Sequence, residues 1–216
     1  MPIPDRNHTA SFDVDAQCTF TPLCPDELPV PEGDQIVPEL NAQAQFARLR
    51  VASKDAHSPH ALWIHNDPAM SGQPGPNGPN MDTWWPHHAE MGSKGFELIP
   101  GLPAVTEYDY FVWKGIELDI HPYGACYHDL AEKMSTGVIE YLKSQSITTV
   151  LVGGLALDFC VKTTALQLRR ADFRVVVNMA ACRGIAEDTC QQAIAEMTAA
   201  GIEVVDDLSD WERAAC

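Results

Sequence analysis

Hydrophobic residues along this chain alternate between short continuous runs and runs with helical spacing. Strands are predicted where apolar and β-branched residues cluster, at 11–14, 50–54, 108–113, 148–152, 173–177 and 203–205. Helices are predicted between them, where apolar residues recur every three or four positions, at 34–47, 129–143, 159–170 and 187–199. This alternation predicts an α/β fold of three layers, in which a mostly parallel sheet carries helices on both faces.

One long segment, 57–103, interrupts the alternation. It is rich in Gly, Pro, His and Trp, and its stretch 72–80 predicts an irregular surface loop. A loop of this length inside a compact domain is usually functional or disordered. Because five of the eight histidines and three of the five tryptophans fall in it, disorder is disfavoured. We therefore expect a single domain, 1–216, in which region 57–103 contributes to a metal or substrate site.

Composition and charge narrow the class of protein. The chain has 30 acidic and 14 basic residues and a net charge of −16, so nucleic acids and anionic membranes would repel it. Its longest apolar run, 150–156, is too short to span a membrane, and the first ten residues lack the apolar part of a secretory signal. The seven cysteines form no CxxC pair, so a disulfide framework is not expected. These features predict a cytoplasmic protein that acts on a small molecule, and they leave a homo-oligomer open.

Side chains that could take part in catalysis stand at the ends of several predicted strands. The carboxyl ends of parallel strands meet at one edge of a sheet, where active sites form. Asp15 and Lys114 each follow a strand, although a turn-capping aspartate or a strand-end lysine is the ordinary alternative. Cys160 opens a predicted helix, where the helix dipole favours the reactive thiolate, although free cysteines are more often packing residues. Together the three residues predict a nucleophilic thiol with an acid–base partner. Asp13 precedes Asp15 by two residues, so both are expected to face the same side of the strand.

A second group of candidates is rich in histidine. Its members follow or lie close to the second strand and in the long loop: Asp55, His57, His60, His65, His87 and His88. Nitrogen and carboxylate ligands suit Zn²⁺, Mn²⁺ or Fe²⁺. Single histidines are usually surface or core residues, so it is their density here that favours a metal site. The pair Gly153 and Gly154 lacks the further residues of a nucleotide-binding motif and is expected to let the backbone approach a substrate.

Several of these segments resemble the isochorismatase-like cysteine hydrolases. Residues 15–20, DAQCTF, resemble the D-x-Q-x-x-F strand end of that family. Residues 112–115, VWKG, resemble its lysine strand, and residues 154–161, GLALDFCV, resemble its G-x-A-x-D-x-C-V elbow. Within the superfamily, 55–57, DAH, and 85–88, WPHH, resemble the D-x-H and W-P-x-H metal motifs of the nicotinamidases (pyrazinamidases). The resemblance extends from about residue 11 to residue 205.

The resemblance implies a role for each of these positions. It implies a catalytic triad of Asp15, Lys114 and Cys160 and a metal held by Asp55, His57 and His88. It implies an oxyanion hole formed by the backbone N–H groups of Ala156 and Cys160. Contacts to the substrate ring would come from Phe20, Trp85 and Ala156. It also implies a cis peptide between Leu155 and Ala156. Two positions depart from the family pattern: Ala89 stands where members often have Cys, and His60 comes one residue earlier than their further histidine.

The resemblance also implies an activity. It implies hydrolysis of nicotinamide to nicotinate and ammonia through a cysteine thioester, a step of NAD salvage. A divalent metal, Zn²⁺ in the first place and Fe²⁺ or Mn²⁺ otherwise, would orient the pyridine ring. The alternative is a metal-independent cysteine hydrolase of another small amide or carbamoyl compound, which would need the triad but not the metal ligands.

Overall fold

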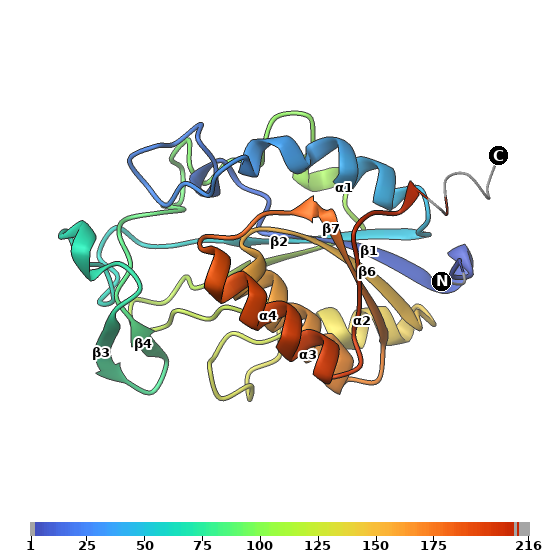
Figure 1. The fold of residues 1–216 in the computed structure, drawn as a ribbon. Coiled ribbons are helices and arrows are strands. Elements are labelled where there is room, and N and C mark those ends of the chain that lie inside the picture. Colours follow the sequence, from blue (N-terminus) through green and yellow to red (C-terminus); the bar gives the residue numbers. More distant parts are fainter. Residues whose placement is uncertain (1–2, 210, 212–216) are drawn as a thin grey trace.

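The centre of the fold is a six-stranded, fully parallel sheet in the order β5-β2-β1-β6-β7-β8. The computed structural model describes residues 3–209 and 211. The strands of the sheet are β1 (Thr9–Val14), β2 (Leu49–Asp55), β5 (Tyr110–Lys114), β6 (Thr149–Gly154), β7 (Arg174–Cys182) and β8 (Glu203–Val205). The chain builds one half of the sheet outward from β1 and then returns to build the other half from β6, which lies beside β1 (Figure 1).

Helices cover both faces of this sheet (Figure 1). Helix α1 (Val37–Ala44) lies on one face, and α2 (Val138–Ser144), α3 (Lys162–Arg170) and α4 (Glu187–Ala199) lie on the other. Alternate residues of β6 divide between the two faces: Val150 and Val152 share a core with Leu168 of α3, whereas Leu151 packs with Trp211. The predicted three-layer α/β fold is therefore confirmed.

Two predicted helices begin later than the apolar spacing indicated. A 3-10 turn, Gly33–Ile36, precedes α1, and Asp34 lies inside that turn without capping the helix. The helix predicted from residue 129 begins only at Val138, because the Asp129 carboxylate accepts hydrogen bonds from the backbone N–H groups of Lys133 and Met134, both at 2.8 Å. Side-chain acceptors of this kind compete with helical hydrogen bonds and stabilise turns.

The long region 57–103 is ordered and lies beyond the carboxyl ends of the strands, at the left of Figure 1. The prediction of an irregular loop at 72–80 is wrong, because β3 (Pro74–Gly78) and β4 (Met81–Thr83) pair there as an antiparallel hairpin. The region has a small core of its own around the fully buried Trp63. The remaining short helices of the chain are Arg6–His8, Cys18–Phe20, Pro68–Met70, Val105–Glu107 and the π-helical turn Leu157–Val161.

Gly154 closes β6 where no other residue would fit. Its φ is 136°, and a Cβ atom there would lie 1.9 Å from the carbonyl oxygen of Val14. A Cβ on Gly153 would meet Ala181 and Leu40 at 2.8 Å. The expected approach of these glycines to a substrate is therefore wrong, since their backbone packs against neighbouring protein atoms.

The two aspartates of the first strand do not share one face, contrary to the sequence-based expectation. Asp13 is buried against Arg50, whose Nε donates to its carboxylate at 2.9 Å, and Tyr108 donates to the same oxygen at 2.9 Å. Asp15 has a φ of 45°, which interrupts the pleat, and its carboxylate instead accepts a hydrogen bond from Ser53. The left-handed conformation of Asp15 thus separates a structural carboxylate from one that is free for chemistry.

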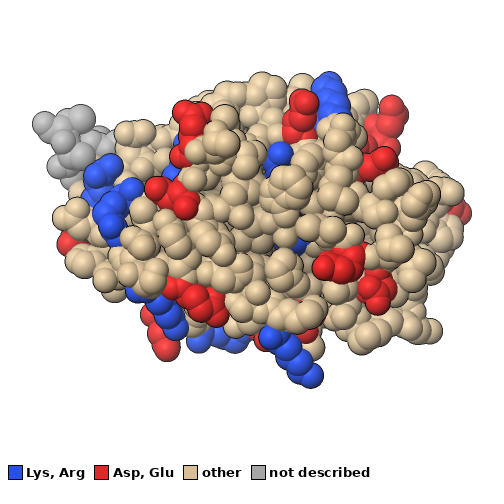
Figure 2. Space-filling model, turned by 180° about the vertical axis from the view of Figure 1, so that it is seen from behind, with Lys and Arg blue, Asp and Glu red and all other residues tan. Residues whose placement is uncertain are grey.

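Acidic and basic side chains are interspersed on the face of the molecule shown in Figure 2, which carries no continuous basic surface. Within the described part of the chain, the structure contains no helix with the length and hydropathy to cross a membrane. The cysteines at 18, 24, 126, 160, 182 and 190 are free thiols, and Cys216 lies outside the described residues.

Candidate active site

The parallel register brings the candidate side chains to one edge of the sheet. Asp55 ends β2 directly opposite Lys114, which ends β5, and Asp15 follows β1 between β2 and β6. The chain reverses the direction in which it adds strands between β1 and β6, and such a switch point opens a crevice at the carboxyl ends. Cys160 enters this crevice from the π-helical turn that follows β6.

Lys114 is the centre of the cluster, because it contacts both carboxylates and the thiol. Its Nζ lies 3.1 Å from Oδ2 of Asp15 and 3.7 Å from Sγ of Cys160, and it forms an ion pair with Asp55. It also donates to the carbonyl oxygen of Pro122 at 3.2 Å. Lys114 and both carboxylates are buried, so the charges compensate one another in the interior.

These contacts shift the pKa of every member. Burial alone would lower the pKa of Lys114, but Asp15 and Asp55 outweigh it and raise the pKa well above its ordinary value. Burial favours neutral Asp55, yet Lys114 and His57 hold its pKa far below the usual range. The pKa of Asp15 is raised by burial, against the opposing charge of Lys114. Asp15 is therefore the carboxylate of the pair that takes up a proton more readily.

The Cys160 thiol is less acidic than its helical position suggested. Burial raises the pKa of Cys160 well above its ordinary value, Lys114 opposes this shift, and the two carboxylates add to it. The helix dipole does not outweigh these effects, so the expected resting thiolate is replaced by a protonated thiol. Its proton needs an acceptor, and oxygens of Asp15 and Asp55 lie within 4.8 Å of Sγ.

The predicted metal ligands lie next to this cluster. His57 and His88 are buried, and the Nδ1 atoms of their rings are hydrogen-bonded to the carbonyl oxygens of Gly115 (2.9 Å) and Pro86 (2.8 Å). These bonds turn each Nε2 away from the backbone, as in metal-bound histidines. Nε2 of His57 has no hydrogen-bond partner among the described residues and lies 3.6 Å from Asp55 Oδ1. The structure thus brings Asp55, His57 and His88 together.

The other histidines of the long region stay outside this group. His60 and His87 are exposed, and the ring of His65 packs on Trp84 and accepts a hydrogen bond from the backbone of Asp67. His87 and His88 therefore point in different directions, as the W-P-x-H register predicts. Ala89, which stands where relatives often have Cys, has a φ of 48° and is fully buried.

Sequence reasoning missed one histidine. His121 is buried, and its ring lies 5.2 Å from that of His57 and 5.6 Å from that of His88. Ligand nitrogens of the three rings lie within 4.8 Å of one another. His121 lies outside region 57–103, where the other candidate histidines gather. A signal was present nonetheless, because Asp119 precedes His121 by two residues and so repeats the D-x-H spacing of Asp55 and His57.

The three histidines suit a metal better than the cluster around Cys160 does. Oxygens of Asp15 and Asp55 and the sulfur of Cys160 also lie close together, but the Lys114 ammonium is among them and would repel a cation. Burial and the neighbouring histidine lower the pKa of His88 to about 3, and similar causes lower the pKa of His121 well below its usual value. Both imidazoles are therefore neutral, which is the form that binds metal.

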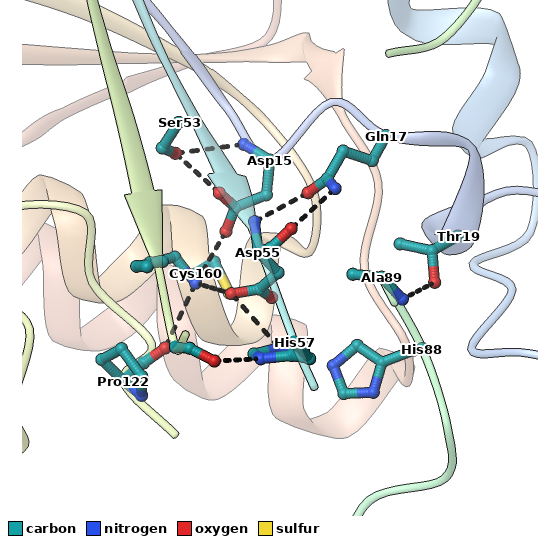
Figure 3. Close-up of polar contacts among 12 residues, drawn as sticks. Asp15, Gln17, Thr19, Ser53, Asp55, His57, His88, Ala89, Pro122 and Cys160 are labelled. Atoms are coloured by element: carbon teal, nitrogen blue, oxygen red, sulfur yellow. Dashed lines mark hydrogen bonds and ion pairs between the residues drawn. The ribbon is translucent and has the colours of Figure 1, made fainter. Parts of the chain in front are cut away.

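Gln17 holds the backbone of Asp55 in place, a role that the motif alone did not reveal. Its side-chain amide donates to the carbonyl oxygen of Asp55 at 2.9 Å and accepts from the Asp55 N–H at 2.8 Å (Figure 3). Thr19 accepts from the N–H of Ala89 at 3.0 Å, which fixes the segment that carries His88. Gln17 and Thr19, which follow β1, thus connect the end of that strand to the segments that carry Asp55 and His88.

Glycine is required on the opposite side of His57. Gly115 has a φ of 76°, and a Cβ there would lie 2.5 Å from the imidazole ring. The absence of a side chain lets the ring reach the carbonyl oxygen that orients it.

The elbow residues are also fixed. The peptide bond between Leu155 and Ala156 is cis, as the resemblance implies, and Ala156 is the residue before the turn that carries Cys160. Asp158 accepts hydrogen bonds from the backbone of Ile185 (3.1 Å) and from the hydroxyl of Thr189 (2.6 Å). The acidic residue of the elbow therefore anchors the turn and is not directed at a substrate.

A narrow cavity joins the thiol to the histidines. It is lined by the predicted residues Phe20, Asp55, Trp85, His88, Ala156 and Cys160 and by residues not singled out from the sequence, Leu28, His121, Tyr123, Phe159 and Ile185. A larger hollow of about 460 Å³, lined among others by His65 and His87, shares only Leu28 with it. The larger hollow reaches neither the thiol nor its acid–base partners, so the narrow cavity is the candidate substrate site.

Comparison with known proteins agrees with this geometry. Residues 10–207 match the Isochorismatase domain family. A nicotinamidase of Acinetobacter baylyi is 33% identical over 203 residues, which cover 91% of this chain and 92% of the relative.

Solved structures give the same result. A nicotinamidase and pyrazinamidase of Acinetobacter baumannii superposes with a TM-score of 0.82 at 29% identity, covering 95% of this chain and 98% of that one. A pyrazinamidase of Pyrococcus horikoshii in complex with zinc has a TM-score of 0.72 at 28% identity, covering 92% and 98%. On the match of nearly its whole length, the chain belongs to the Isochorismatase domain family.

Proposed function

We propose that this chain hydrolyses nicotinamide to nicotinate and ammonia through a thioester on Cys160. The observation that carries the proposal is one cavity that reaches the thiol of the acid–lysine–thiol cluster at one end and the imidazoles of His88 and His121 at the other. The relatives named nicotinamidases, one of them 33% identical, support this choice of amide. In this account the cavity holds a small-molecule substrate between the thiol at one end and a divalent metal at the other.

Acylation begins with proton transfer. The Asp15 carboxylate takes the thiol proton of Cys160, and the sulfur attacks the carboxamide carbon to form a tetrahedral intermediate. Asp15 then passes this proton to the amide nitrogen, the C–N bond breaks, and ammonia leaves. The raised pKa of Asp15 fits a group that both accepts and donates this proton.

Hydrolysis of the thioester reverses these roles. Asp15, ionised again, takes a proton from a water molecule that attacks the thioester carbon. The C–S bond then breaks, Asp15 returns its proton to the sulfur, and the product leaves as nicotinic acid, which gives up its own proton to the solvent to become nicotinate. The N–H groups of Ala156 and Cys160 are the proposed donors to the oxyanion in both halves of the reaction, because the turn carries them beside the sulfur.

Lys114 acts through the carboxylates. Its charge opposes the effect of burial on the pKa of Asp15 and so favours the ionised carboxylate. The same charge lies 3.7 Å from Sγ and stabilises the thiolate as it forms.

The other end of the cavity orients the ring. We propose that Asp55, His57 and His88 hold a divalent metal, Zn²⁺ in the first place, because nitrogen and carboxylate donors suit it. When bound, this ion would anchor the pyridine nitrogen and fix the amide over the sulfur. Phe20 and Trp85, both buried, would flank the ring.

The activity itself is tested by ammonia release from nicotinamide and from benzamide, which lacks the ring nitrogen. We expect turnover of nicotinamide, loss of that turnover on treatment with a chelator, and more than about a hundredfold loss in Cys160→Ala. Cys182→Ala, which removes another buried thiol, is the matched control and should stay active. Chelator-resistant turnover would favour the metal-independent alternative, and no ammonia from any small amide would reject the activity.

His88 and His87 form a matched pair of variants. His88→Ala should lose bound metal and raise KM for nicotinamide, because it removes a buried inward-facing imidazole. His87→Ala removes an exposed one and should behave like the wild type. Elemental analysis together with steady-state kinetics measures both effects. Metal loss in His87→Ala but not in His88→Ala would contradict the assignment.

Ser53 gives a test of the general base. Its hydroxyl donates to the Asp15 carboxylate at 2.6 Å and so lowers the pKa of that group. Because Asp15 must be ionised to accept the thiol proton, loss of this bond in Ser53→Ala should move the acidic limb of kcat/KM to higher pH. Ser58→Ala, in the loop after the same strand, is the control. A limb that stays in place or moves to lower pH would exclude Asp15 as the group that sets it.

A further inference from the structure

His121 is a buried imidazole whose hydrogen-bonding capacity is unused. Its side chain is only 4% exposed, yet neither ring nitrogen has a hydrogen-bond partner among the described residues. A polar ring that only fills space would be costly to bury in this way. The two unpartnered nitrogens therefore point to a ligand.

The surroundings of His121 narrow the chemistry of that ligand. Its ring is stacked with that of His57 at 24° and lies beside that of His88. His57 Nε2 is likewise a buried nitrogen without a hydrogen-bond partner among the described residues. Three imidazole nitrogens that converge within 4.8 Å suit a cation that accepts imidazole ligands.

The backbone around His121 is held on several sides. Its own N–H donates to the carbonyl oxygen of Asn80 at 2.8 Å, and Trp63 Nε1 donates to that of Ile120 at 3.1 Å. Lys114 donates to the carbonyl oxygen of the next residue, Pro122. The ring is therefore placed in the cavity by a fixed segment, and the same segment contacts the lysine of the catalytic cluster.

We propose that His121 is a further protein ligand of the metal, so that three imidazoles, from His57, His88 and His121, bind one ion beside Asp55. The proposal rests on the proposed function, which places a divalent metal at this site. Metal–nitrogen bonds of about 2.0–2.1 Å would bring the ligand nitrogens closer together than they lie here. The required movement is a small one, because ligand nitrogens of the three rings already lie within 4.8 Å of one another.

A third imidazole would change which metal the site selects. Asp55 shares its carboxylate with the Lys114 ammonium, which weakens it as a donor to a metal. Nitrogen ligands then dominate, and such a set favours Zn²⁺, Fe²⁺ or Co²⁺ over Mn²⁺ and Mg²⁺. Asp55 is left as the link between the metal and the acid–base cluster.

X-ray absorption of the full-length protein loaded with Zn²⁺ counts the imidazoles directly. We expect three in the wild type and two in His121→Asn. Competition with a chelator should show at least about a hundredfold weaker Zn²⁺ binding in His121→Asn, since loss of even an outer partner of a ligand costs up to that much. His87→Asn, an exposed histidine beside the site, is the control and should keep both the imidazole count and the affinity.

Two outcomes overturn the proposal. These are two imidazoles in the wild type, or unchanged Zn²⁺ affinity in His121→Asn. If that variant does not fold, the count in the wild type still decides. Ammonia release by the same wild-type preparation separates the two hypotheses: activity with only two imidazoles rejects the role of His121 alone, whereas no activity rejects the proposed function whatever the count.

Discussion

The buried ion pairs of Lys114 with Asp15 and Asp55 are the interaction on which the site depends. A buried ammonium is stable only where carboxylates compensate it, and removal of one partner leaves an uncompensated charge. The three side chains come from three strands, so they meet only if β1, β2 and β5 are parallel and in the observed register. A shift of β5 by one residue would turn Lys114 to the other face of the sheet. The fold and the chemistry are therefore specified by the same pairing.

The cluster also divides the cavity into two regions of different chemistry. In the proposed reaction Asp15, Lys114 and Cys160 would handle protons and the carbonyl carbon, whereas the histidines would hold a metal that positions a ring. Asp55 lies between them, paired with Lys114 and 3.6 Å from His57. Because the thiol is protonated at rest, reactivity depends on a substrate that is held beside Asp15 and Cys160 together. Orientation by the distant end of the substrate is then as important as the nucleophile itself.

Much of this arrangement was predictable from the sequence, for a physical reason. Strand periodicity and the strand-end positions of Asp15, Asp55 and Lys114 are local features of the sequence. Because the strands are parallel, their carboxyl ends lie at the same edge of the sheet, which brings these three residues together. Contacts between distant segments were not predictable. The helix expected at residue 129 yields to hydrogen bonds from the Asp129 side chain, and the pKa of Cys160 depends on burial that no motif encodes. The segment of His121 is held beside the other histidines by contacts with residues far away in the sequence, among them Asn80 and Trp63.

The central claim is that these strand ends make Cys160 a nucleophile toward a pyridine carboxamide. It is tested most directly by acid quenching during turnover of nicotinamide, followed by mass spectrometry of the intact protein and of its peptides. The account predicts a protein species heavier by one nicotinoyl group, with the group attached to the peptide that contains Cys160. The added mass should disappear as the substrate is exhausted. Turnover with no such species, or a nicotinoyl group on another residue, would contradict the account.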